Sequence, residues 1–291
     1  MMHKPRGRGF TLIELLVVIA IIALLMAILM PALARAKKQV KGVACQSNLH
    51  EWGLAFQLFV NDHDDYLMKG PYKGPHGDID NHKMENYWLM ALLPYIGGIM
   101  DPCSKASDIF MCPMAAKSLN PDDCIWCPGT TFSAWGPFQP VSWGWWDTVV
   151  MGSYGINEWC SNPTSDFYCT LPCEYMWRTP DAKGASNAPL LLDGIWLESL
   201  PQHDDEPPPY PDQYDPFGIC WIINGMKIFC IDRHSGGINA VFLDWSVRKI
   251  GLKELWTLKW HRQYETHGPW TKAGGVQPDD WPQWMRRFKD Y

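Results

Sequence analysis

The feature that most constrains this chain is an uncharged apolar run near its N-terminus. The twenty residues from Leu15 to Ala34 carry no charged side chain, and one carboxylate, Glu14, directly precedes them. As an α-helix such a run is about 30 Å long, which matches the hydrocarbon thickness of a bilayer. It therefore predicts a membrane helix. An ionised Glu at membrane depth costs roughly 2.5 to 3.5 kcal/mol on insertion scales, so we expect Glu14 to have a partner.

A cleaved signal peptide is an alternative interpretation, because ALARAKK is close to a small-residue cleavage site. The length of the apolar run, the position of Glu14 and the continuing helical pattern argue against it. Basic residues flank the run on both sides, so charge leaves the orientation open. The formal net charge of -6 over 291 residues does not favour nucleic acid as a partner.

The stretch RGRGFTLIELLVVIAII resembles a type IV prepilin leader, which type IV pilins and the pseudopilins of type II secretion share. The resemblance implies cleavage between Gly9 and Phe10 by a prepilin peptidase and methylation of the new N-terminus at Phe10. It also implies that Glu14 pairs with the Phe10 amine of a neighbouring subunit during assembly, and that the helix bends near Pro31. Snorkelling of Glu14 to the membrane surface is the alternative.

The apolar pattern continues beyond the membrane run as a stripe at steps of three and four residues, formed by Cys45, Leu49, Trp52, Phe56 and Phe59. We expect one helix from about Phe10 to Asn61, broken near Pro31 and at Gly42 and Gly53. The expected organisation is a leader at 1–9, a transmembrane and assembly helix at 10–34, its soluble continuation at 35–62, and a head at 63–291 with a Trp-rich tail. The fold class is α+β and pilin-like, with the helix packed on an antiparallel sheet.

Several later segments resemble large prepilin-type proteins of Planctomycetes and related bacteria: CQSNLHEWGLAFQLFVNDHDDYL, FMCP at 110–113, SYGIN at 153–157, LLLDG at 190–194 and RHSGGINAVFLDWSVRKI at 233–250. Members carry a His, nine residues and Asp-Gly near the C-terminus. His234 and Asp244 have this spacing, but Trp245 replaces the Gly. The last segment predicts two strands joined at Asp244-Trp245, and the turn type stays open because Trp resists positive φ. We expect structural hydrogen-bonding roles for His234 and Asp244.

Ten Cys in a chain carried across a membrane favour disulfides over zinc. The candidates are Cys103, Cys112, Cys124, Cys127, Cys160, Cys169, Cys173, Cys220 and Cys230, and the sequence leaves their pairing open. Asp62, Asp64 and Asp65 in NDHDDY are candidate calcium ligands, with a capped helix end as the alternative. No other cofactor is expected. The acidic, Pro-rich stretch 202–216 is expected to be an exposed loop.

These observations predict a structural subunit rather than an enzyme, held in the inner membrane by a single helix, with its head in the periplasm or outside the cell. Its expected partners are the prepilin peptidase, other pilin or pseudopilin subunits, and a secretion or pilus assembly platform. The alternative is a tethered binding protein that holds polysaccharide or another envelope component on a Trp-rich face, including WGWWD at 143–147.

Overall fold

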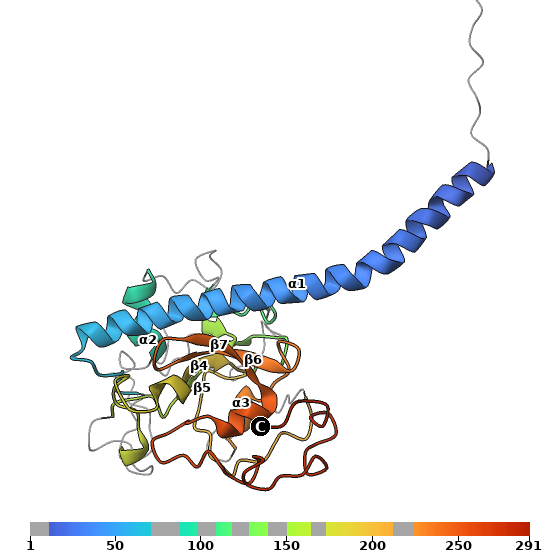
Figure 1. Ribbon diagram of the computed structural model, residues 1–291. Helices are drawn as coiled ribbons and strands as arrows, with labels where there is room; N and C mark the ends of the chain where they lie inside the picture. The colour runs from blue at the N-terminus through green and yellow to red at the C-terminus, as the bar shows by residue number, and fades with distance from the viewer. Residues whose placement is uncertain are drawn as a thin grey trace, which may run out of the picture. The chain divides into compact units, whose positions relative to one another are not determined.

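The computed structural model describes residues 12–70, 88–97, 109–117, 128–138, 150–163, 173–211 and 224–291. The chain divides into two compact units, Met1–Lys41 and Gly42–Tyr291. Helix α1 and a β-sheet dominate the described residues, so the expected α+β, pilin-like architecture is confirmed (Figure 1).

Helix α1 runs from Leu12 to Asp62 and is 51 residues long. The expected breaks do not interrupt the helix, because Pro31, Gly42 and Gly53 all lie inside it. The expected bend near Pro31 stays a prediction. A proline removes one backbone hydrogen bond but leaves the bonds of the turns on either side intact. The other backbone hydrogen bonds therefore keep the helix continuous past Pro31.

The part of α1 in the first unit presents apolar side chains all round. Its large aliphatic side chains from Leu12 to Leu33 are each 46 to 79% exposed. Within the described residues, α1 is the helix that is long and apolar enough to cross a membrane. A surface of this kind is unstable in water, so the first unit has to be covered by lipid or by protein.

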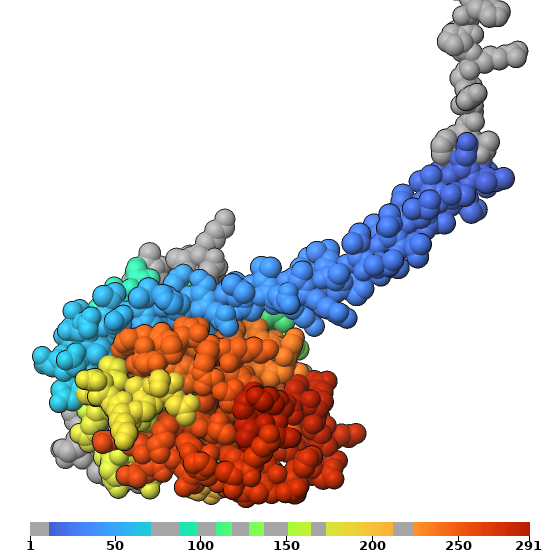
Figure 2. Space-filling view, viewed as in Figure 1, coloured from blue at the N-terminus to red at the C-terminus, as the bar shows by residue number. Residues whose placement is uncertain are grey.

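In the second unit α1 buries the predicted stripe. Cys45, Leu49, Trp52 and Phe56 are at most 1% exposed, and Phe59 is nearly as buried. The side-chain amide of Gln46 donates a hydrogen bond to Asn239 on the sheet, at 3.1 Å. Figure 2 shows this part of α1 in direct contact with the orange surface of the head.

The main sheet has five strands in the order β5-β3-β4-β6-β7. β3 pairs antiparallel with β4, β4 with β6, and β6 with β7, but β3 pairs parallel with β5, so the sheet is mixed rather than antiparallel throughout. The inner strand β6, between β4 and β7, is fully buried, as its apolar sequence GINAVF requires. The bounds are β3 Tyr154–Asn157, β4 Pro189–Asp193, β5 Glu198–Ser199, β6 Gly237–Phe242 and β7 Val247–Gly251.

Short elements surround this sheet. The antiparallel pair β1 and β2 forms a second, two-stranded sheet. The bounds are β1 Trp135–Phe138, β2 Val150–Gly152, α2 Trp88–Leu92 and α3 Met226–Phe229, with 3-10 helices at Leu93–Ile96, Cys173–Tyr175, Ala185–Asn187 and Leu252–Thr257.

The turn between β6 and β7 resolves the question that Trp245 raises. Phe242 N–H donates to the Ser246 carbonyl at 2.9 Å, which closes a three-residue loop, and Trp245 adopts a left-handed φ of 67°. This is the position at which such loops favour Gly. Asp244 stabilises the turn by accepting hydrogen bonds from the N–H and hydroxyl of Ser246 at 3.1 and 2.6 Å.

The last 34 residues, from 258 onward, contain no helix or strand, but they pack against the head. Trp260 and Trp281 are at most 2% exposed, and the Trp284 indole donates to the Pro208 carbonyl at 2.8 Å. Buried indoles, rather than a backbone ladder, hold this segment in place.

Candidate functional sites

The leader and the cleavage junction lie outside the described residues, so Gly9 and Phe10 are not placed. Glu14 occupies the first turn of α1. A carboxylate there interacts favourably with the partial positive charge of the helix N-terminus. Exposed aliphatic side chains precede and follow Glu14 in the sequence, from Leu12 to Leu33. The described N-terminal end of α1 therefore carries one acidic side chain on an otherwise apolar surface.

The head contains a buried polar cluster formed by Cys45, Cys112, Asp193 and His234. Their potential ligand atoms all lie within 4.8 Å of one another, and all four residues are buried. Cys45 lies on α1, and Asp193 is the last residue of β4. Cys112 and His234 lie in loops. Four segments that are distant in the sequence therefore meet at one point.

The loop before β6 holds His234 in position. Ser235 and Gly236 adopt positive φ values of 53° and 86°, and the His234 N–H donates to the Gly237 carbonyl at 2.9 Å. Asp232 accepts the Gly236 N–H at 2.6 Å. The small residues of RHSGG allow this tight reversal, which directs His234 into the head.

Asp193 is the centre of the cluster. Its Oδ2 atom lies 3.1 Å from His234 Nε2 and accepts the Asn239 N–H at 2.8 Å. Its Oδ1 atom lies 3.1 Å from the Arg233 guanidinium, whose side chain is also fully buried. Cys45 Sγ lies 3.5 and 3.6 Å from the two carboxylate oxygens.

The two sulfur atoms have further partners. Cys112 Sγ lies 3.3 Å from His234 Nε2 and accepts the Met114 N–H at 3.5 Å. The Tyr154 hydroxyl donates to Cys45 Sγ at 3.5 Å. Ser153 accepts the Cys112 N–H at 2.6 Å, which fixes the backbone that carries this thiol.

These contacts shift the acidities of the cluster. Burial opposes ionisation of Asp193, but its hydrogen bond with His234 and the charge of Arg233 outweigh burial and lower the pKa of Asp193 to about 2. Burial also opposes the cationic form of His234, but hydrogen bonds with Asp193 and Cys112 raise its pKa to about 9. For Cys112, contacts with Cys45 and His234 outweigh burial and lower the pKa to about 7. Burial raises the pKa of Cys45.

His234 and Asp244 both make hydrogen bonds, but not with each other. His234 contacts Asp193 and Cys112, whereas Asp244 caps the β6-β7 turn through Ser246. Sequence reasoning missed Cys45 and Asp193 as members of a site. The signal that could have found them is that CQSN, FMCP, LLLDG and RHSGG, the segments quoted above for their resemblance, each contribute one member of the cluster.

The described cysteines differ from the disulfide expectation. Cys112, Cys160, Cys173 and Cys230 are free thiols in the structure, as is Cys45. Each buried thiol has its own environment: Cys160 contacts the Pro189 carbonyl at 3.5 Å, and Cys230 contacts the Met285 sulfur at 3.9 Å. The remaining candidates, Cys103, Cys124, Cys127, Cys169 and Cys220, lie outside the described residues, as does WGWWD.

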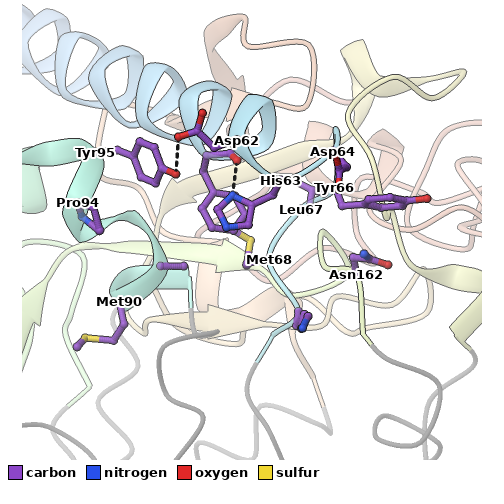
Figure 3. A pocket seen from close by; sticks show the side chains of 13 residues that line it. Asp62, His63, Asp64, Tyr66, Leu67, Met68, Met90, Pro94, Tyr95 and Asn162 are labelled. Atoms are coloured by element: carbon purple, nitrogen blue, oxygen red, sulfur yellow. Dashed lines mark hydrogen bonds between the residues drawn. The ribbon is translucent and has the colours of Figure 1, made fainter.

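The three aspartates suggested for calcium lie at the C-terminal end of α1. Asp62 accepts a hydrogen bond from the Tyr95 hydroxyl at 2.9 Å, and Figure 3 shows the two side chains directed toward each other. Asp62 and Asp64 both line the pocket drawn there. Asp64 and Asp65 have positive φ values of 53° and 64°, so they form the turn that ends the helix. Calcium binding by this group stays a prediction.

Comparison with known proteins agrees with the N-terminal pattern. The prokaryotic N-terminal methylation motif matches residues 4–30. The type IV major pilin protein PilA of Myxococcus xanthus (strain DK1622) is 40% identical over 63 residues, which are 22% of this chain and 29% of that pilin. The match thus spans under a third of the pilin's length. No solved structure matches the chain. The resemblance to type IV pilin-like proteins is confirmed.

Proposed function

We propose that this chain, which is type IV pilin-like, is a structural subunit of a type II secretion or type IV pilus-like filament. It is made with a basic leader, is cut by a prepilin peptidase between Gly9 and Phe10, and is methylated at Phe10. The motif at residues 4–30 and the similarity to a major pilin support this processing and assembly with other pilin-like subunits.

The observation that carries the proposal is the apolar surface of α1 in the first unit. Side chains from Leu12 to Leu33 are half to four-fifths exposed, although an uninterrupted surface of this size is unstable in water. Lipid covers it before assembly and the same helices of neighbouring subunits cover it afterwards. The inner membrane is therefore the proposed storage site, with the head in the periplasm or outside the cell.

Glu14 fixes the axial alignment of neighbouring subunits along that apolar surface. Cleavage creates a cationic amine on Phe10, and a carboxylate in a low-dielectric bundle is stabilised when such a charge lies close to it. An incoming subunit places its amine against the Glu14 of a neighbour. Because displaced subunits would separate the two charges, the pair selects one axial position.

The proposal assigns no catalytic role to the head. His234 is 8% exposed and is held by Asp193 and Cys112. The alternative of a Trp-rich binding face gains no support from the described indoles, each of which is buried or half-buried. Polysaccharide retention by the head would favour that alternative.

Mass spectrometry of the N-terminus of the protein from its native membrane tests the proposal. We expect a chain that begins with N-methylated Phe10. A Gly9→Val variant should keep its leader, whereas the neighbouring Gly7→Ala variant should be processed normally. A mature wild-type chain that begins at Met1, or that is cut beyond Ala34, would contradict the proposal.

A further inference from the structure

We propose that Cys45, Cys112, Asp193 and His234 form a site for one zinc ion that fixes α1 to the head. The set combines two sulfurs, one imidazole and one carboxylate, which are the side chains that bind Zn²⁺ in proteins. Soft sulfur ligands disfavour Ca²⁺ and Mg²⁺, which take oxygen ligands.

Three of the six distances between the ligand atoms are close to those of a tetrahedral site, and all six are at most 4.8 Å. With Zn–S of about 2.3 Å, Zn–N of about 2.05 Å and Zn–O of about 2.0 Å, tetrahedral angles place S and O about 3.5 Å apart, S and N about 3.6 Å, and N and O about 3.3 Å. In the structure, Cys45 Sγ and Asp193 Oδ2 are 3.6 Å apart. Cys112 Sγ and His234 Nε2 are 3.3 Å apart, and His234 Nε2 and Asp193 Oδ2 are 3.1 Å apart. These three ligand-to-ligand distances differ from the ideal ones by about 0.3 Å or less.

The surrounding groups orient the ligands. Asp193 presents Oδ2 to the site while Arg233 holds Oδ1, and the Asn239 N–H also donates to Oδ2. The Tyr154 hydroxyl and the Met114 N–H point at the two sulfurs. Hydrogen bonds of this kind to ligand atoms are typical of metal sites and stabilise thiolates.

The charges of the occupied site balance. Two thiolates and one carboxylate carry three negative charges, which the divalent ion and the buried Arg233 guanidinium offset. Each protonated thiol and the imidazolium of His234 lose a proton to solvent as the sulfur or nitrogen atom binds, so binding releases protons and strengthens as pH rises. A neutral assembly is the form that a buried position tolerates best.

Four protein ligands leave no open position, which is the pattern of a structural zinc site rather than a catalytic one. The ligands come from α1, a loop, the end of β4 and the loop before β6. The ion therefore ties these four segments of the second unit together.

Metal analysis of the full-length chain, purified in detergent under reducing conditions, tests the site. We expect about one zinc per chain. Chelator-treated wild-type protein should gain thermal stability when Zn²⁺ is added, and with Co²⁺ it should develop the absorption bands of a tetrahedral, thiolate-bound ion. These wild-type measurements do not depend on whether any variant folds.

Substitutions of single residues test which side chains bind the zinc. Cys112→Ser and His234→Gln should lose the zinc, whereas Cys230→Ala, which removes a buried thiol outside the cluster, should retain it. Tyr154→Phe keeps all four ligands but removes a donor to Cys45, so it should weaken Zn²⁺ binding roughly 10-fold or more. Wild-type protein without zinc and without a Co²⁺ spectrum would overturn the proposal. So would a Cys45-Cys112 disulfide in protein from the native membrane, or unchanged Co²⁺ binding by Cys112→Ser.

Discussion

His234 Nε2 lies 3.1 Å from Oδ2 of Asp193, the last residue of β4. Its partner is therefore not Asp244, which follows it by ten residues in the sequence. Asp244 instead accepts the Ser246 hydroxyl in the β6-β7 turn. The spacing of His234 and Asp244 thus reflects two roles in one hairpin: His234 joins a buried cluster before β6, and Asp244 closes the turn after it.

Arg233→Lys should destabilise the head strongly. The buried Arg233 guanidinium donates to Asp193 and to the backbone carbonyls of Thr130, Thr131 and Gly194, a pattern that a single ammonium cannot reproduce. Lysine keeps the charge but leaves buried carbonyls without a donor, and each such group costs about 1 to 3 kcal/mol. Denaturant unfolding of the full chain in detergent measures the change.

The control for Arg233 is Arg248→Lys. Arg248 pairs with Glu254, but its side chain is 37% exposed, so the same replacement there should cost less than about 1 kcal/mol. Equal effects at the two positions would show that the buried network does not stabilise the head.

Much of the architecture could be predicted from the sequence because it follows local periodicity. The apolar stripe at Cys45, Leu49 and Trp52 predicted both the helix and the face that it buries, and the apolar sequence of β6 predicted a strand. The expected break at Pro31 does not interrupt α1, because one missing hydrogen bond does not end a long helix.

The head cluster could not be predicted in the same way. Its four members come from segments that only the folded sheet brings together, and no local spacing relates Cys45 to Asp193. The expectation of an exposed acidic loop at 202–216 was wrong for Asp205, which is 7% exposed. Backbone N–H groups of Gln202 and Met226 bond its carboxylate, and composition does not reveal such contacts.

Glu14→Ala should leave leader cleavage intact while incorporation into filaments falls. The peptidase acts at the Gly9-Phe10 junction, whereas under the proposed function the Glu14 carboxylate is needed later, when a neighbouring amine docks. The mass of the mature chain reports cleavage, and cross-linking between α1 helices reports assembly. Glu51→Ala, an exposed position on the part of α1 in the second unit, is the matched control and should assemble normally. Normal assembly of Glu14→Ala would exclude the pairing.

His261 should make the head sensitive to mild acid. Its ring is buried and stacks on Tyr175 at 4.6 Å, and its Nδ1 accepts the Gln263 N–H at 3.2 Å. Burial, with the charges of Lys259 and His203, lowers the pKa of His261 to about 4. The unfolded chain therefore binds more protons between about pH 6.5 and 4, and the free energy of unfolding falls as pH falls through that range.

A His261→Phe variant keeps a stacking ring without a titrating group. Its unfolding free energy should change less than that of the wild type between pH 6.5 and 4 in urea titrations. His267→Phe removes a histidine whose side chain is 71% exposed, so it should keep the wild-type slope. Parallel slopes for His261→Phe and the wild type would count against this assignment.

Asp205 should act in the opposite direction. Burial, with the charge of Asp204, raises its pKa to about 6 from an ordinary value of 3.8. The folded chain binds the extra proton, so stability is lost as pH rises from about 4 to 6. An Asn at this position can still accept the N–H bonds of Gln202 and Met226 but carries no charge.

Asp205→Asn should therefore be more stable than the wild type at pH 7 and should approach it near pH 4, as measured by melting temperature. Asp204→Asn, on an exposed neighbour, should preserve most of the wild-type pH dependence. If the Asp205→Asn and wild-type curves stay equally spaced at all pH values, Asp205 does not titrate as inferred.

The left-handed backbone conformation of Trp245 costs free energy, and two substitutions can measure that cost. Its φ of 67° is left-handed, which Gly adopts freely and other L-residues adopt at about 1 to 2 kcal/mol. Trp245→Ala removes the half-buried indole but keeps this cost, whereas Trp245→Gly removes both. The Gly variant should therefore be more stable than the Ala variant by roughly 1 kcal/mol in denaturant unfolding. At Lys249, within β7, the order should reverse because Gly weakens a regular strand. An Ala variant at 245 as stable as the Gly variant would mean that the turn does not hold this residue in the left-handed region.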